Sequence, residues 1–273
     1  MDRRSTTVAP EFARTWMLRA ATRLQPPHDR LAPDALIVDL EDGVPAARKD
    51  EGRALAAEWF GSGGRAWVRI NSVDSPFWSD DILAVGSWSG VEGVVLAKTE
   101  SGEQAARTYH MLGDRLPVIA LIESALGIEN AVRIAQAHGV FRLAFGSGDY
   151  RRDTATAATD LAMAYPRSRL VTASRIAQLP GPIDGPTLGA DLDRVRAHTL
   201  TAVELGLAGK LTLDPTQVPV INDAASPSVD DVVNARQLLR ELDGGGITDG
   251  SQLPALGRSR RLVELADAYG IGA

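Results

Sequence analysis

The chain has 273 residues, of which 44% are hydrophobic and 23% are charged, as in an ordinary globular protein of one or two domains. Its net charge of −6 argues against nucleic-acid binding, and no apolar run reaches the roughly 18–20 residues of a membrane helix. Cysteine is absent, which excludes disulfides, thiolate catalysis and sulfur-ligated metals. We find no secretory signal in the N-terminal residues and therefore expect a cytoplasmic protein.

Short apolar segments alternate along the chain with segments of helical periodicity. The predicted strands are 15–18, 35–40, 66–71, 93–97, 118–122, 142–146, 182–184 and 210–213. The main predicted helices are 46–60, 79–85, 102–112, 128–135, 153–178, 192–203, 229–242 and 256–269. Eight β/α units over about 250 residues predict a (β/α)8 TIM barrel. The competing fold is a doubly wound open sheet, but we find no glycine-rich phosphate fingerprint to support it.

The organisation that we predict has three parts. Residues 1–13 form a loose N-terminal segment, residues 14–222 form the catalytic TIM-barrel domain, and residues 223–273 form a C-terminal helical extension. The basic residues near the first strand could bind phosphates, although surface arginines are more often only solvated; they are Arg14, Arg19, Arg23 and Arg30.

Two neighbouring predicted strands each end on a carboxylate. Glu123 follows the apolar run 118–122, and Asp149 follows the strand that ends near Gly146. Because catalytic groups of a TIM barrel lie at the carboxyl ends of its strands, we expect both acids at one rim. One or two carboxylates, with the remaining positions left to water and substrate, suit Mg²⁺. The alternative is a purely structural role, in which both acids only stabilise helix N-termini.

The other strand ends add charged and polar groups to this rim. They are Glu41 and Asp42, Arg69 and Asn71, Lys98, Asp184 and Asp214. A buried arginine needs an anionic partner, so Arg69 either binds an anionic substrate or forms a structural pair with Glu41 or Asp42. Asp184 and Asp214 also fit ordinary turns. The four histidines fall in predicted loops or helices, which argues against a zinc hydrolase.

Six stretches, in order, resemble the HpcH/HpaI aldolase and citrate lyase β-subunit (CitE-like) family. They are DALIVDLEDGV at 34–44, VRIN at 68–71, GVVLAKTES at 93–101, ALIESALG at 120–127, FGSGD at 145–149 and GKLTLDPTQ at 209–217. Each stretch alone is weak evidence for the family, but the set of six in this order is specific for it. One departure is Arg19 to Arg23, where relatives usually carry a Pro-Gly turn near the nucleotide part of CoA.

The resemblance implies a barrel of the phosphoenolpyruvate/pyruvate type, assembled as a homotrimer or homohexamer. It implies Mg²⁺ held by Glu123 and Asp149, and catalytic roles for Arg69, Glu41 and Asp42. Substrate contacts are expected from Arg69, Glu123 and Lys98. The partner is a small oxo or hydroxy acid, either free or as a CoA thioester.

These residue types suit retro-aldol or Claisen-type cleavage of a hydroxy acid to a 2-oxo acid and an enolate. Mg²⁺ supplies a Lewis acid, Arg69 supplies positive charge where negative charge grows, and Glu41 or Asp42 is the candidate base. Two alternatives stay open. One is a CoA-independent aldolase acting on free pyruvate or oxaloacetate, and the other is a non-catalytic barrel subunit.

Overall fold

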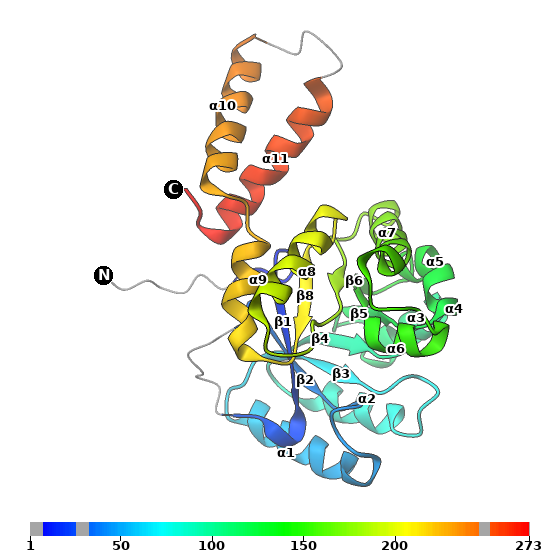
Figure 1. Cartoon of the computed structure of the whole chain (residues 1–273). Helices are drawn as coiled ribbons and strands as arrows, with labels where there is room; N and C mark the ends of the chain where they lie inside the picture. The colour runs from blue at the N-terminus through cyan, green and yellow to red at the C-terminus, as the bar shows by residue number, and fades with distance from the viewer. Residues whose placement is uncertain (1–7, 26–32, 246–251, 273) are drawn as a thin grey trace.

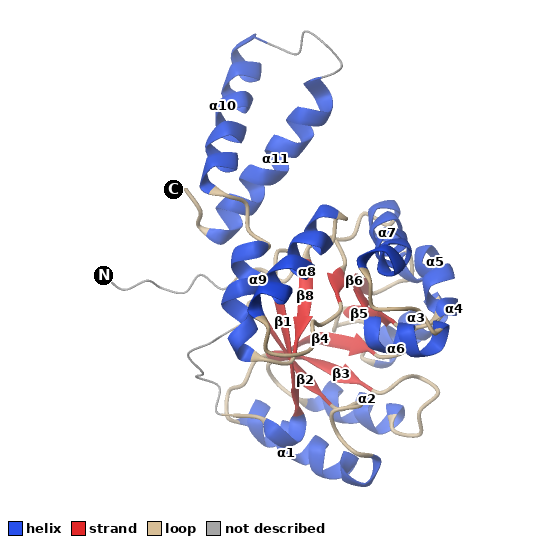
Figure 2. Ribbon diagram, in the orientation of Figure 1, coloured by secondary structure: helices blue, strands red, loops and turns tan. Residues whose placement is uncertain are grey.

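The computed structural model describes residues 8–25, 33–245 and 252–272. Within these residues eight parallel strands close into a barrel in sequence order, as Figures 1 and 2 show. The strands are β1 Thr15–Ala20, β2 Ala35–Asp39, β3 Ala66–Ile70, β4 Val91–Leu96, β5 Val118–Ile122, β6 Val140–Phe145, β7 Ile183–Asp184 and β8 Gly209–Thr212. The barrel closes where β8 pairs with β1, with Leu211 opposite Trp16. The predicted TIM barrel is confirmed.

Helices surround the strands on the outside of the barrel (Figure 2). They are α1 Lys49–Gly61, α2 Trp78–Ser87, α3 Gly102–Met111, α4 Ala125–Glu129, α5 Ala131–Ala135, α6 Ser147–Thr154, α7 Asp160–Ile176, α8 Leu192–Glu204 and α9 Val218–Ala224. Two further helices, α10 Val229–Gly245 and α11 Gln252–Tyr269, follow the barrel in the chain. Short 3₁₀ turns lie at η1 Ala21–Arg23, η2 Ala46–Arg48 and η3 Pro215–Gln217.

Two of the predicted helices are each divided into two. The stretch predicted at 153–178 is α6 followed by α7, because Ala155 adopts a left-handed conformation at φ +55° that ends α6. Thr159 then caps α7 by accepting a hydrogen bond from the backbone N–H of Ala162. The stretch predicted at 128–135 is α4 and α5, joined at Asn130.

The apolar core has an inner and an outer layer. Alternate residues of every strand form one cluster inside the barrel, where the rings of Trp16 and Trp67 meet edge to face at 5.5 Å. The intervening residues, such as Val68 and Ala120, pack beneath the helices. This second layer explains why most strand residues are apolar on both faces instead of alternating with polar residues.

A buried ion cluster lies in the outer layer, beneath α7. Both oxygens of Asp184 accept hydrogen bonds from Arg167, at 2.9 and 3.0 Å, and Lys210 donates to the same carboxylate at 2.9 Å. Asp184 ends β7, as predicted, but it is fully buried, so the alternatives that it faces the rim or only forms a turn are wrong. Burial alone would raise the pKa of Asp184, but the charges of Lys210 and Arg167 outweigh it and lower the pKa.

The C-terminal helices α10 and α11 pack against each other and extend from the barrel as a hairpin (Figure 1). The end of α11 meets the start of the barrel, because the Tyr269 hydroxyl donates to the carbonyl oxygen of Phe12 at 2.9 Å. The guanidinium of Arg14 lies 4.1 Å above the Tyr269 ring. No described helix is long and apolar enough to cross a bilayer.

We expect Asp184→Asn to lower the free energy of unfolding by about 3–5 kcal/mol at neutral pH, because it leaves two buried cations without their carboxylate. The folded-state pKa of Asp184 is depressed, so its contribution is present above the unfolded-state pKa and is lost as the pH falls through the folded value. Urea titrations at several pH values should therefore show that the difference in free energy of unfolding between the wild type and Asp184→Asn becomes smaller below about pH 4.

The matched control is Asp223→Asn, which removes an exposed carboxylate that pairs with Arg196. It should change stability by about 1 kcal/mol or less. A variant Asp184→Asn that is as stable as the wild type, or whose deficit does not depend on pH, would contradict the structural role of the cluster.

Candidate active site

The carboxyl ends of five neighbouring strands, β2 to β6, deliver the residues of the candidate site. Glu41 and Asp42 follow β2, Arg69 lies near the end of β3, Lys98 follows β4, Glu123 follows β5, and Asp149 lies in the first turn of α6, after β6. Parallel strands bring their carboxyl ends to the same edge, which is why residues so far apart in sequence converge.

Arg69 is clamped by a carboxylate from the neighbouring strand. Its Nε and Nη2 donate to the two oxygens of Asp39, both at 2.7 Å, and its Nη1 lies 3.3 Å from Glu41. Burial alone would lower the pKa of Arg69, but the pairing with Asp39 outweighs burial and raises it. The pair with Glu41 that the sequence suggested is present, but the stronger partner, Asp39, was not predicted, although an acid within an otherwise apolar strand is a usable signal.

The loop after β2 is held in place from beneath. Asp39 also accepts hydrogen bonds from the backbone N–H groups of Glu41 and Gly43, each at 2.9 Å. A Cβ on Gly43 would lie 2.3 Å from a carboxylate oxygen of Asp39, so only glycine fits there. The buried ammonium of Lys49 donates to the carbonyl oxygen of Glu41 at 2.8 Å and to Asn71 Oδ1 at 2.9 Å. The position of Glu41 is therefore set by several buried polar contacts.

Lys98 connects Glu41 and Asp42 on one side of the site with Glu123 on the other. Its backbone N–H donates to Glu123 Oε1 at 2.8 Å, while its ammonium pairs with Glu41 and lies 3.6 Å from Asp42. Lys98 adopts a left-handed backbone conformation, φ +51°, which is strained for a residue with a side chain. A continuous chain of contacts thus runs from Arg69 through Glu41 and Lys98 to Glu123.

Glu123 is almost completely buried, with 6% of its surface exposed. Burial, together with the negative charges of Asp149 and Glu41, raises the pKa of Glu123 to about 8. A Cβ on Gly146 would lie 2.3 Å from Glu123 Oε2, so the glycine makes room for this carboxylate. Since the backbone N–H of Lys98 occupies Oε1, Oε2 remains for another partner.

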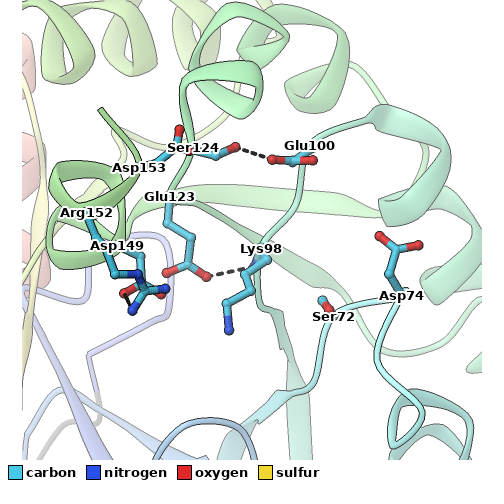
Figure 3. A pocket seen from close by; sticks show the side chains of 9 residues that line it. All are labelled: Ser72, Asp74, Lys98, Glu100, Glu123, Ser124, Asp149, Arg152 and Asp153. Carbon is cyan, nitrogen blue, oxygen red and sulfur yellow. Dashed lines mark hydrogen bonds and ion pairs between the residues drawn. The ribbon is translucent and has the colours of Figure 1, made fainter. Parts of the chain in front are cut away.

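Glu123 and Asp149 line one cavity of about 490 Å³, into which Lys98 also points (Figure 3). The Asp149 carboxylate pairs at 3.1 Å with Arg152, which is 72% exposed. A second cavity of about 320 Å³, lined by Glu41 and Asp42, shares Lys98 with the first. Most of the predicted site residues therefore gather around two adjoining hollows, whereas Arg69 lines neither and lies behind Glu41.

The residues present fit a magnesium ion between Glu123 and Asp149. Both donors are carboxylate oxygens, and no group of three or more His, Asp or Glu side chains among the described residues could hold a metal ion, so water and substrate would fill the remaining positions. Mg²⁺ commonly uses one or two carboxylates and keeps several waters. Burial and the negative charges of Asp149 and Glu41 raise the pKa of Glu123, and a divalent cation at this carboxylate would favour its ionised form.

Several residues of the larger cavity were missed by the sequence analysis. They are Ser72, Asp74, Glu100, Ser124, Arg152 and Asp153. Asp153 lies one helical turn after Asp149, a spacing that could have identified it. Its carboxylate accepts a hydrogen bond from the Ala125 N–H at 2.8 Å. Asp214 caps η3 by accepting from the Thr216 N–H at 2.9 Å, as expected for a helix start.

Comparison with known proteins places this chain in a family. The model of the HpcH/HpaI aldolase/citrate lyase family matches residues 16–215, and that of the HpcH/HpaI aldolase C-terminal domain matches residues 230–270. A citrate lyase subunit beta-like protein of Deinococcus radiodurans is 31% identical over 223 residues, which cover 77% of this chain and 78% of that protein.

Two further relatives agree with this match. A (3S)-malyl-CoA thioesterase of Cereibacter sphaeroides is 28% identical, with 89% of each chain covered. The solved structure of the citrate lyase beta subunit of M. tuberculosis, complexed with oxaloacetate and magnesium, is 26% identical with a TM-score of 0.67, covering 80% of this chain and 99% of that chain. The chain therefore belongs to the HpcH/HpaI aldolase/citrate lyase family.

Proposed function

We propose that this protein is a Mg²⁺-dependent carbon–carbon lyase that cleaves a CoA-linked hydroxy acid to a 2-oxo acid and an enolate. Relatives named for citrate cleavage and for malyl-CoA support the substrate class, and a relative solved with oxaloacetate and magnesium supports the product and the metal. The observation that carries the proposal is the contact chain from Arg69 to Glu123, which adjoins the cavity shared with Asp149.

Glu123 and Asp149 would hold the metal. When bound, Mg²⁺ withdraws electron density from substrate oxygens as a Lewis acid. The protein contributes Glu123 Oε2, which is left free when Oε1 accepts the Lys98 N–H, and Asp149, whose pairing with the exposed Arg152 is easily exchanged. Both carboxylates thus have oxygens available at the cavity.

Arg69 provides fixed positive charge for the developing enolate. Its two hydrogen bonds to Asp39 orient the guanidinium before the substrate arrives, so little reorganisation is needed during the reaction. Nη1 points toward Glu41 and away from this clamp, which makes it the donor for a substrate oxygen. The substrate contacts assigned to Arg69, Glu123 and Lys98 all lie along this chain.

Glu41 is the general base in this proposal. It takes the proton of the substrate hydroxyl, the electrons of that O–H bond form the carbonyl of the 2-oxo acid, and the electrons of the broken C–C bond pass to the departing enolate. Asp42 is the second candidate. Burial alone would raise the pKa of Asp42, but Glu41, Lys98 and Arg69 lower it overall.

The CoA part of the substrate has fewer partners than the sequence suggested. Arg14 is occupied by Asp34, which accepts from its Nε at 2.7 Å and from its Nη2 at 3.0 Å, and Arg30 lies outside the described residues. Arg23 in η1 is exposed and available to a phosphate group.

We assign catalysis to the barrel domain, residues 14–222, and expect the protein to assemble as a homotrimer or homohexamer.

The first experiment compares substrates. We expect the purified protein with Mg²⁺ to release oxaloacetate from citryl-CoA or glyoxylate from malyl-CoA, and to lose this activity in excess EDTA. Free 4-hydroxy-2-oxo acids serve as competing substrates in the same assay. Cleavage of the free acids alone would identify a CoA-independent aldolase. If neither class of substrate is cleaved, the remaining hypothesis is a non-catalytic barrel subunit.

The second experiment replaces the clamped guanidinium. Arg69→Lys keeps the charge but loses the planar fork that fits Asp39, so we expect kcat to fall by about 10²–10³-fold. Steady-state kinetics on the better CoA thioester provide the measurement, with the thermal midpoint recorded to verify folding.

The control for this variant is Arg65→Lys, since Arg65 precedes β3 and its side chain is 72% exposed. It should leave kcat unchanged. Equal kcat values for the wild type and a folded Arg69→Lys variant would remove Arg69 from the mechanism.

A further inference from the structure

A separate cavity of about 210 Å³ lies outside the barrel, among α6, α7, α8 and the chain that follows β7. Ser147 and Gly148, in the first turn of α6, line this cavity, whereas the next residue, Asp149, lines the candidate active site. The first turn of α6 therefore separates two hollows, and the proposed lyase chemistry uses only one of them.

The floor of this cavity holds more positive than negative charge. Arg167 and Lys210 both pair with Asp184, and their side chains are only 7% and 2% exposed. Two buried cations thus share one buried carboxylate, which leaves excess positive charge in a region of low dielectric constant. Such a charge is costly unless an anion approaches it.

Arg167 also has an unused donor at the cavity. Its Nη1 is buried and has no hydrogen-bond partner among the described residues. The nearest acid is Asp160, whose oxygen is 3.6 Å away, too far for a hydrogen bond, on a side chain that is 58% exposed. A buried guanidinium N–H of this kind is the group that an oxyanion would satisfy.

The walls add further cationic and N–H groups. The exposed residues Arg151 and Arg194 line the cavity, and a Cβ on Gly148 would meet nothing within 4 Å, so a ligand can approach the backbone there. Burial, followed by the positive charges of Lys210, Arg167 and Arg194, lowers the pKa of His198 in the wall.

From these contacts we infer that the cavity is a second binding site, for a small anion that carries a phosphoryl or carboxylate group. Nη1 of Arg167 would donate to the anion at the floor, Arg151 and Arg194 would neutralise it at the entrance, and the N-terminal turn of α6 would face it. A volume of about 210 Å³ admits phosphate or a short dicarboxylate but not a CoA molecule. The inference does not depend on the lyase proposal.

The test measures the binding of inorganic phosphate by isothermal titration calorimetry at constant ionic strength, without added divalent cation. We expect saturable binding to the wild type and a loss of affinity of about tenfold or more in Arg151→Gln/Arg194→Gln, since both positions are exposed and should tolerate the change. Malonate in a parallel titration distinguishes a dicarboxylate ligand from a phosphoryl ligand, and saturable binding of either at these arginines supports the site.

Arg175→Gln is the matched control, because it removes an exposed arginine from α7, the helix that carries Arg167. This variant should bind inorganic phosphate with the affinity of the wild type. The inference fails if neither anion binds saturably, if Arg151→Gln/Arg194→Gln binds as tightly as the wild type, or if Arg175→Gln loses affinity to the same extent.

Discussion

Two hydrogen bonds of 2.7 Å tie the guanidinium of Arg69 in β3 to the carboxylate of Asp39 at the end of β2. The same carboxylate accepts the backbone N–H groups of Glu41 and Gly43, so it fixes the loop that carries the candidate base. Glu41 in turn pairs with Lys98, whose N–H reaches Glu123. The geometry of the site therefore depends on one buried charge pair placed by the register of two adjacent strands.

Burying this much charge is costly, and the structure limits the cost by matching most cations with acids. Among the described residues, two departures from this balance flank α6. Negative charges gather around Glu123, and burial together with Asp149 and Glu41 raises its pKa to about 8. Beneath α7, positive charge is in excess around Arg167 and Lys210. The first imbalance suits a divalent cation and the second suits an anion. Uncompensated charge on opposite sides of α6 thus points to ligands of opposite sign.

The barrel was predictable because its strands are short apolar runs and its helices have a clear period, both of which are local properties. The rim residues Glu123 and Asp149 were predictable from their places after strands. The roles of Asp39 and Asp184 as partners of buried cations were not predicted. Whether an acid at a strand end faces solvent or a buried cation depends on residues distant in sequence, here Arg69 and Arg167. The division of α6 from α7 depends on a single left-handed residue, which no periodicity shows.

The central claim is that Glu123 and Asp149 together bind Mg²⁺, and calorimetric titration of Mg²⁺ tests it most directly. The wild type should bind the ion, and a folded Glu123→Gln/Asp149→Asn variant should not. Glu100→Gln/Asp153→Asn removes two carboxylates from the same cavity and should retain binding. Mg²⁺ binding of wild-type strength by the Glu123→Gln/Asp149→Asn variant would contradict the account.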